Sequence, residues 1–191
     1  CTTGSAADFS DVTSAYDWAS EPIDQLSDAG IVTGYPDGTF KPGNSVSKQE
    51  SIALFARMMG STEDINSAIL EFATDTYADE FEHLDTFANK EMSYLIYKHA
   101  LAVSDIPTYL NNSVMDAPTK RYEAATLIAK CLGGDVWLKG NPTIEVSFPD
   151  KDQIPDNALG YVQYATNLGI IKGMDDGTFN PNGDVTRAQM A

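Results

Sequence analysis

The 191-residue sequence is poor in basic residues, with 12 lysines and arginines against 28 aspartates and glutamates and a formal net charge of −16. Nucleic-acid binding needs cations that replace the counterions of the phosphates, and attraction to an anionic lipid surface needs the same positive charge. A nucleic-acid partner is therefore excluded, and electrostatic binding to an anionic lipid surface is disfavoured. The chain is not a disordered acidic tail, because 42% of its residues are hydrophobic and 10% are aromatic, which is enough to form a core.

Cysteine and histidine are also scarce, with two of each. Two cysteines are too few for a disulfide framework or a structural zinc site, so we expect no metal and no cofactor. Cys131 lies in an apolar helical run, where it is expected to be a small buried hydrophobic residue. No apolar run approaches the roughly 20 residues of a membrane-spanning helix, so no transmembrane segment is expected.

The chain repeats itself when it is shifted by 139 residues, so that Gly30 falls on Gly169. Residues 30–42 align with residues 169–181, and both segments end in Asp-Gly-Thr-Phe-x-Pro. A more divergent copy begins near residue 77, half-way between the other two. Such self-similarity is the signature of a repeat architecture. We predict units at residues 8–60, 77–134 and 148–191, with an inserted helix at residues 62–75 before the second unit and a third unit that is cut short.

Each unit is interpreted as two helices separated by a loop. Apolar residues at helical spacing indicate the first helix, and Gly30 or Gly169 follows it, where a left-handed C-cap favours glycine. The second helix begins at a capping box, which is Ser-Lys-Gln-Glu at residues 47–50 and Thr-Arg-Ala-Gln at residues 186–189. Alternating runs of β-branched residues are absent, so the expected fold class is mainly α with at most short strands.

The second unit departs from this pattern. Residues 100–107 lack the glycines of the loop, and Glu123 stands one position late when the capping box is counted from Thr119. Segments 103–117 and 135–147 are interpreted as linker-like. A groove built from the loop of the second unit is therefore expected to be closed or altered.

The order of these motifs resembles the S-layer homology (SLH) domain: Phe-x-Asp, a helix, Gly-Ile-Val-x-Gly-x-x-Asp-Gly-Thr-Phe-x-Pro, and then Val-Thr-Arg-Ala-Gln. The three copies look like the triplet in which that domain usually occurs, and the resemblance is stronger in the first and third units than in the second. It implies one pseudo-threefold module over residues 1–191, with a central helix bundle and projecting helical prongs.

The resemblance also implies a function without catalysis. Proteins of this family attach a larger surface protein non-covalently to a secondary cell-wall polysaccharide, often one carrying pyruvate ketals, which lies in grooves between neighbouring units. The expected location is extracellular, at the bacterial cell wall or S-layer. A peptidoglycan-linked polymer is a related partner. The alternative function is an assembly module of an S-layer or surface filament, whose partners are mainly other protein subunits.

In that family a basic residue at the start of the second helix contacts the acidic group of the ligand. Cations there are disfavoured by the helix dipole, and a site beside backbone N–H groups without helical partners makes sense if an anion is held. Three aromatic residues are expected to pack on sugar faces. The alternative is that the cations are solvated or pair with a nearby carboxylate. The expected ligand-binding residues are Lys48, Arg121, Arg187, Gly34, Gly173, Trp18, Tyr35 and Tyr161.

Single residues or pairs of residues suggest three further functional interpretations. Cys1 is similar to the lipidated first residue of bacterial lipoproteins, although a boundary of the cloned or trimmed chain would place it there as well. Acidic pairs such as Asp150 and Asp152 could be imagined as glycosidase carboxylates, but nothing separates one pair from the other acids. Asp175 begins an Asp-Asp-Gly run that lacks the alternating oxygens of a calcium loop, so no metal site is expected.

Overall fold

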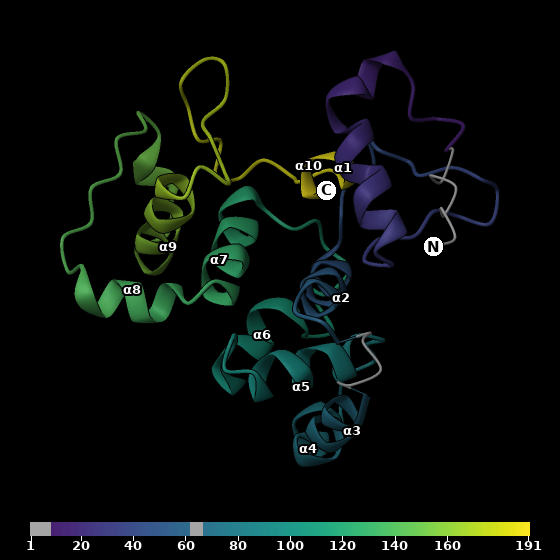
Figure 1. Ribbon diagram of the computed structural model, residues 1–191. Helices are drawn as coiled ribbons and strands as arrows, with labels where there is room; N and C mark the ends of the chain where they lie inside the picture. Colours follow the sequence, from purple (N-terminus) through teal and green to yellow (C-terminus); the bar gives the residue numbers. More distant parts are fainter. Residues whose placement is uncertain (1–8, 62–66) are drawn as a thin grey trace.

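The computed structural model describes residues 9–61 and 67–191 and is mainly helical, which confirms the expected fold class. Figure 1 shows α2, α7 and α10 at the centre, with α1, the group α3–α6 and the pair α8–α9 around them. None of the described helices has the length and apolar character needed to cross a membrane. The α-helices are α1 (Asp17–Asp28), α2 (Lys48–Met58), α3 (Ser67–Thr76), α4 (Ala78–Phe81), α5 (Asn89–Tyr97), α6 (Ile106–Tyr109), α7 (Arg121–Cys131), α8 (Gly134–Gly140), α9 (Asp156–Asn167) and α10 (Arg187–Met190). Three 3₁₀ turns, η1 (Ser14–Tyr16), η3 (Val103–Asp105) and η4 (Lys151–Gln153), precede α1, α6 and α9.

Three extended segments meet at the centre, just before α2, α7 and α10. The backbone N–H of Val46 donates to the carbonyl of Val185 (3.0 Å), that of Val185 to Thr119 (3.0 Å), and that of Thr119 back to Val46 (2.8 Å). Across residues 9–61 and 67–191, β pairing is limited to the isolated bridges of these segments. The cycle relates the starts of the three helices by a pseudo-threefold axis.

Each of the three outer groups has its own buried cluster. Ile23 and Phe40 are completely buried beside α1, and Val162 and Phe179 are completely buried beside α9. The largest cluster joins α2, α5 and α7 around Tyr94. The phenylalanine of each Asp-Gly-Thr-Phe loop is therefore a core residue, and burial of such a side chain stabilises the fold by roughly 1.5–3 kcal/mol.

The Phe-x-Asp motif that opens the first and third units clamps the loop of the same unit. The Asp11 carboxylate accepts hydrogen bonds from the backbone N–H groups of Phe40 (2.7 Å) and Lys41 (2.8 Å). Asp150 accepts in the same way from Phe179 and from the residue after it, both at 2.8 Å. Because the acceptor is charged, these bonds are stronger than neutral ones. This aspartate is part of the repeat motif in the sequence, and its structural role is to hold the loop backbone of its own unit.

The glycine C-caps predicted after the first helix of the outer units are confirmed. Gly30 and Gly169 have φ angles of +70° and +71°. In the middle unit His99 follows α5 with a φ of +58°, so an exposed histidine adopts the left-handed conformation that glycine adopts more readily.

The two segments interpreted as linker-like contain helices, and that interpretation was wrong. Segment 103–117 begins with η3 and α6, which bury Tyr109 and Leu110. Segment 135–147 lies partly in α8, where Trp137 stacks on Tyr164 of α9 with ring centroids 5.1 Å apart. Helices of four to seven residues have too little periodicity to be recognised in a sequence, and tertiary packing stabilises them here.

Candidate functional site

The three cations of the helix-start motif lie at equivalent places, and each reaches from one unit to the loop of another. Lys48, Arg121 and Arg187 are the first residues of α2, α7 and α10. Each side chain donates a hydrogen bond to a main-chain carbonyl across the junction. The pairs are Lys48 with Thr108 (3.2 Å), Arg121 with Lys172, and Arg187 with Thr33 (2.8 Å). We call these places the Lys48, Arg121 and Arg187 junctions.

The backbone N–H groups beside these cations are already paired, so the expectation of free N–H groups is wrong. Those of Lys48, Arg121 and Arg187 donate to carbonyls of a neighbouring unit at 3.0, 2.9 and 2.8 Å. The next N–H in each helix does the same, to Met115, Pro181 and Pro42. The usual orphan donors of a helix start are therefore used to join the units. Any anion at a junction would have to be held by side chains.

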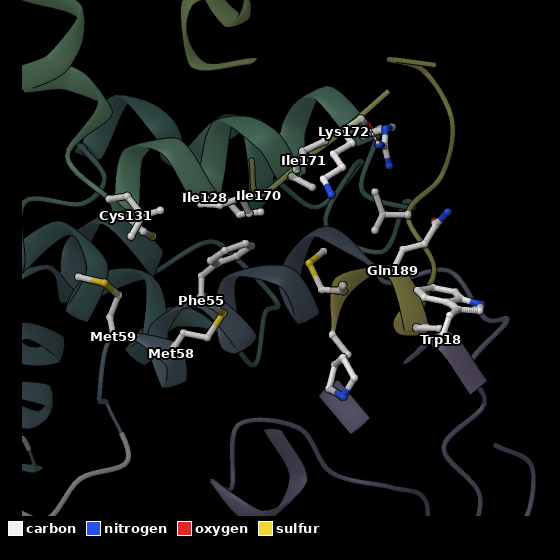
Figure 2. Close-up of a pocket in the computed structure, with 18 residues that line it drawn as sticks. Trp18, Phe55, Met58, Met59, Ile128, Cys131, Ile170, Ile171, Lys172 and Gln189 are labelled. Atoms are coloured by element: carbon white, nitrogen blue, oxygen red, sulfur yellow. Dashed lines mark hydrogen bonds between the residues drawn. The ribbon is translucent and has the colours of Figure 1, made fainter. Parts of the chain in front are cut away.

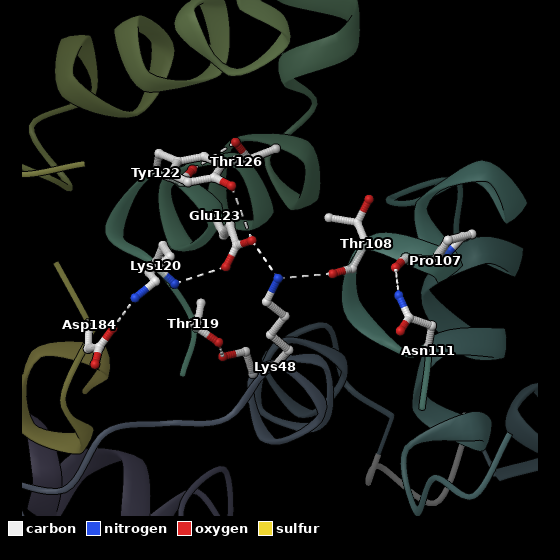
Figure 3. Close-up of polar contacts among 11 residues, drawn as sticks. Lys48, Pro107, Thr108, Asn111, Thr119, Lys120, Tyr122, Glu123, Thr126 and Asp184 are labelled. Carbon is white, nitrogen blue, oxygen red and sulfur yellow. Dashed lines mark hydrogen bonds and ion pairs between the residues drawn. The ribbon is translucent and has the colours of Figure 1, made fainter. Parts of the chain in front are cut away.

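The Lys48 junction is closed by an ion pair (Figure 3). The Nζ of Lys48 lies 2.6 Å from Oε1 of Glu123, and the two side chains are only 12% and 4% exposed. The other oxygen of Glu123 accepts from the N–H of Lys120 at 2.9 Å. Lys120 is the residue that caps α7, so Glu123 stands at the ordinary third position of the helix. Only the Glu123 half of a capping box is present, because the lysine side chain is a donor and makes no cap hydrogen bond. Of the two alternatives for Lys48, pairing with a carboxylate is the one that the structure shows.

The loop of the middle unit also fills its side of that junction. Tyr109 and Leu110 are 2% and 0% exposed. Burial, together with the charge of Glu123, raises the pKa of Tyr109 well above its ordinary value, so this phenol stays neutral. The Lys48 junction is therefore packed and neutralised from within the protein.

The Arg187 junction is built differently. The Nε of Arg187 donates to the carbonyl of Phe40 (2.7 Å), and its guanidinium carbon lies 4.4 Å from the ring centroid of Phe40 and 5.2 Å from that of Tyr35. Lys41 approaches the ring of Tyr35 with its Nζ 3.9 Å from the centroid. Among the described residues Arg187 takes part in no ion pair. Two cations and two aromatic rings thus gather here, and of the two cations only Lys41 has a carboxylate partner in the described part of the chain, Asp37 at 3.7 Å.

The Arg121 junction resembles the Arg187 junction, with a guanidinium close to an aromatic ring. The guanidinium carbon lies 5.3 Å from the ring centroid of Phe179. The Nε of Arg121 is buried and has no hydrogen-bond partner in the described part of the chain, and no ion pair of that part includes this arginine. Burial lowers the pKa of Arg121 from its ordinary value, although an arginine remains charged in proteins. A buried donor without a partner costs about 1–3 kcal/mol, which a ligand acceptor would offset.

The two predicted glycines make room for the clamp residues of their own units. A Cβ at Gly34 would lie 2.2 Å from the ring of Phe9, and one at Gly173 would lie 2.8 Å from the ring of Phe148. Gly34 directly precedes Tyr35 in the chain, so its backbone conformation also affects where the Tyr35 ring lies. The close approach gives both glycines a packing role that needs no ligand.

Among the described residues, neither of the other two predicted aromatics lies under the guanidinium of a motif arginine. The hydroxyl of Tyr161 donates to Asp135 (2.5 Å), and its ring is 5.5 Å from the Nζ of Lys130, close to the end of α7 opposite Arg121. Nine residues at 1.5 Å each separate the two ends by about 14 Å. Trp18, on α1, is 61% exposed and lines a cavity, shown in Figure 2, to which Arg121 and Lys172 also contribute. Of the eight predicted residues, the structure therefore brings together Arg187, Tyr35 and Gly34 at one junction, and Arg121 and Gly173 at another, where Arg121 bonds the carbonyl of the residue before Gly173.

Sequence analysis missed Lys172 and the pairing of Glu123. Lys172 lies within the segment that aligns with the first unit, at the position of Thr33, and only its nearness to Arg121 makes it notable. Within the described ranges no group of three or more His, Cys, Asp or Glu side chains could hold a metal ion. Cys1, the candidate for lipidation, lies outside the described residues.

The fold and the junctions define a helical module in which repeated units close on one another. A sequence model of the S-layer homology domain matches residues 8–50 and 147–191. The first and third units match the S-layer homology domain family, as the motifs of these outer units indicated. The matched segments contain the loops and helix starts of the first and third units, and the middle unit remains a prediction from the repeat pattern.

Comparison with curated proteins gives relatives of the same kind. The chain is 26% identical over 162 residues to "Cell surface glycoprotein 1" of Acetivibrio thermocellus, covering 82% of this chain and 6% of that protein. It is 28% identical over 169 residues to the "Cellulosome-anchoring protein" of the same species, covering 84% and 34%. It is 26% identical over 177 residues to the "Amylopullulanase" of Thermoanaerobacterium thermosulfurigenes, covering 91% and 9%.

The chain thus spans about a third or less of the length of these relatives. One of them is named as an enzyme, and the match covers 9% of it. The shared segment is a module carried by proteins with different names, so the match assigns no catalytic activity.

Proposed function

We propose that the chain anchors a larger surface protein to the bacterial cell wall by binding an acidic wall polysaccharide, without catalysis. The observation that carries the proposal is the presence of two motif arginines, Arg121 and Arg187, without a carboxylate partner among the described residues of a chain of net charge −16. The names of the relatives support it, since they include "Cell surface glycoprotein 1" and "Cellulosome-anchoring protein".

The ligand group best suited to these junctions is a carboxylate, such as that of a pyruvate ketal. A guanidinium has five N–H donors. Arg187 gives two to main-chain carbonyls, which hold its plane in place and leave donors for a bidentate contact. The ring of Tyr35, whose centroid lies 5.2 Å from the same guanidinium carbon, offers an apolar surface for a sugar. We propose Arg187, Tyr35 and Lys41 as one site and Arg121 with Lys172 as a second.

The Lys48 junction is proposed as a structural contact rather than a third site. Its cation is neutralised by Glu123 and is 12% exposed, so a ligand carboxylate would have to displace a buried counter-ion. Breaking such a pair is costly. The proposed stoichiometry is therefore two acidic groups for each module.

Co-sedimentation with purified cell-wall sacculi tests the proposal. The wild-type chain should pellet with intact sacculi and remain in solution when the acidic polysaccharide has been removed. Arg121→Ala and Arg187→Ala should each weaken the apparent affinity by about tenfold or more, because charge-assisted bonds contribute roughly 1.5–3 kcal/mol each. The matched control is Lys139→Ala, which removes an exposed cation from α8, away from the junctions, and should pellet as wild type.

Two outcomes would contradict the proposal. Pelleting that persists after removal of the acidic polysaccharide would favour protein or peptidoglycan contacts, as in an S-layer assembly module. Equal affinities for the arginine variants and the Lys139 control would make Arg121 and Arg187 ordinary surface cations. Circular dichroism of each variant separates a loss of binding from a loss of folding.

A further inference from the structure

Residues 141–148 connect α8 to η4 as an extended segment without helix, turn or bend. Figure 1 shows this segment along the left edge of the molecule, in green, outside α9. Pro142 favours an extended conformation of the residue before it, and Thr143, Ile144 and Val146 are β-branched residues that favour a strand. The segment has the composition of a β-strand, although β pairing in the described ranges is confined to the bridges at the centre of the fold.

The backbone of residues 142–147, which we call the exposed edge, is largely unpaired. One N–H, that of Glu145, donates to the side-chain oxygen of Gln163 on α9 at 3.1 Å. The other N–H groups and all the carbonyls of the exposed edge have no protein partner in the described part of the chain. Apart from Val146, these residues are exposed. A row of such backbone groups is a template on which another extended chain can pair.

A pocket of about 270 Å³ opens beside the exposed edge. Ile144 and Val146 line it from the edge, and Ile154 and Leu159 line it from the side of α9. Residues two apart in an extended chain lie on the same face, which is why Ile144 and Val146 share the pocket. In a strand added to the edge, every second side chain would lie on the pocket side. The pocket therefore favours apolar side chains at alternate positions of a partner.

The charges around the exposed edge are mainly negative. Asp152 and Asp156 line the pocket together with Lys151, and Glu145 lies on the edge between its two apolar residues. All four residues are exposed, and none of their side chains forms an ion pair within residues 9–61 and 67–191. Three carboxylates against one ammonium group favour a partner with basic side chains, whereas a polymer that carries carboxylates would be repelled.

We propose that the exposed edge binds a basic, extended peptide of another protein, which adds to it as a β-strand. Main-chain hydrogen bonds supply the affinity, apolar side chains of the peptide enter the pocket, and lysine or arginine side chains between them meet the carboxylates. The proposed site uses none of the residues of the arginine junctions, so it does not depend on polysaccharide binding.

A second copy of the chain is a less suitable occupant. An antiparallel pair of exposed edges centred on Glu145 would place two carboxylates opposite each other, and like charges in that position destabilise a strand pair. Each copy would also carry a net charge of −16. Charge therefore favours a partner of different sequence.

Isothermal titration calorimetry of the whole chain with three synthetic peptides tests the proposal. The first peptide is Thr-Lys-Val-Lys-Val-Lys-Thr with blocked ends. The second is N-methylated at its third and fourth residues, which removes a backbone donor from each edge of the peptide strand and keeps its charge. The third has glutamate in place of lysine. The second peptide should bind about tenfold more weakly than the first, and the third should show no saturable binding.

Hydrogen–deuterium exchange locates the contact. The first peptide at saturation should slow exchange of the backbone amides of residues 143–147, because they become hydrogen-bonded. Unchanged exchange in this segment, or equal affinities of the first and second peptides, would overturn the proposal. Slow exchange that increases with chain concentration in the absence of peptide would identify a second copy as the occupant and would overturn it as well.

Two matched charge reversals test the electrostatic part. Glu145→Lys should weaken binding of the first peptide by about fivefold, since an attractive cross-strand pair becomes a repulsive one, and it should bind the glutamate peptide more tightly than the wild type does. Glu80→Lys, at an exposed position of α4, makes the same change in net charge and should bind the first peptide as the wild type does. Equal affinities of the two variants for the first peptide would overturn the assignment of a basic partner to this edge.

Discussion

The ion pair between Lys48 and Glu123 makes the sharpest prediction, because it decides whether Lys48 belongs to the wall-binding surface. In Lys48→Met the methionine occupies similar space, but the Glu123 carboxylate, 4% exposed, loses its counter-ion. Removing one partner of a buried pair costs 3–5 kcal/mol. We expect about 3 kcal/mol, at the lower end of that range, because the carboxylate keeps its bonds from Lys120 and from the hydroxyl of Tyr122. The thermal midpoint should fall by about 6–12 °C.

A double-mutant cycle isolates the charge interaction from changes in packing. Glu123→Gln keeps an oxygen for the N–H of Lys120 but leaves the lysine unpaired, so we expect a loss of about 2 kcal/mol. The double variant has no buried charge and should lie within about 1 kcal/mol of the wild type. Urea denaturation followed by circular dichroism gives the four free energies of unfolding.

The outcome that would refute this reasoning is a cost of about 0.5 kcal/mol or less for Lys48→Met, which is the behaviour of an exposed pair. The Lys48 side chain would then be available to bind a ligand. The double variant should also pellet with sacculi as the wild type does. Loss of pelleting in a double variant that is still folded would show that Lys48 contributes to wall binding.

Three further predictions use single residues. His99→Gly should raise the free energy of unfolding by about 1 kcal/mol, measured by urea denaturation, because glycine adopts the left-handed conformation with less strain. Gly34→Ala should destabilise by about 1–3 kcal/mol, since its Cβ would collide with Phe9, whereas Gly140→Ala, with open space around it, should be neutral within about 0.5 kcal/mol. Burial raises the pKa of Cys131 to about 12. Its alkylation at pH 8, followed by mass spectrometry on its own peptide, should be about a thousandfold slower in the folded chain than in urea, and should rise about tenfold per pH unit. A rate that levels off below pH 10 would contradict the last prediction.

Local features of the fold could be predicted because their causes lie within a few residues. The C-cap glycines Gly30 and Gly169 follow directly from the end of an apolar helical pattern, and the capping boxes at residues 47–50 and 186–189 are complete within four residues. The repeat then extends each local prediction to a second place in the chain. Short helices such as α6 and α8 were not predicted from the sequence, because packing against other segments, rather than their own residue pattern, stabilises them.

The site was harder to predict because its decisive contacts join residues far apart in sequence. Lys48, Arg121 and Arg187 are equivalent by motif, and a sequence offers no sign that, of these three, Lys48 alone has an ionic partner within residues 9–61 and 67–191. That partner, Glu123, is 75 residues away in the sequence. Glu123 also caps α7 locally, and this local role gives no indication of its ion pair with Lys48. The repeat motif placed the three cations correctly at helix starts, but the N–H groups beside them donate to carbonyls of neighbouring units.

The backbone cycle of Val46, Thr119 and Val185 has a consequence for the number of units and for folding. In open repeat proteins each unit contacts only its neighbours, so units can be added or lost at the ends. Here the first and last segments bond directly, across 139 residues from Val46 to Val185, and a fourth unit could enter only by opening the cycle. Such distant contacts raise the contact order and slow folding for a helical protein. The proposed sites at Arg121 and Arg187 thus depend on closure of the whole module, and no single unit would carry a complete one.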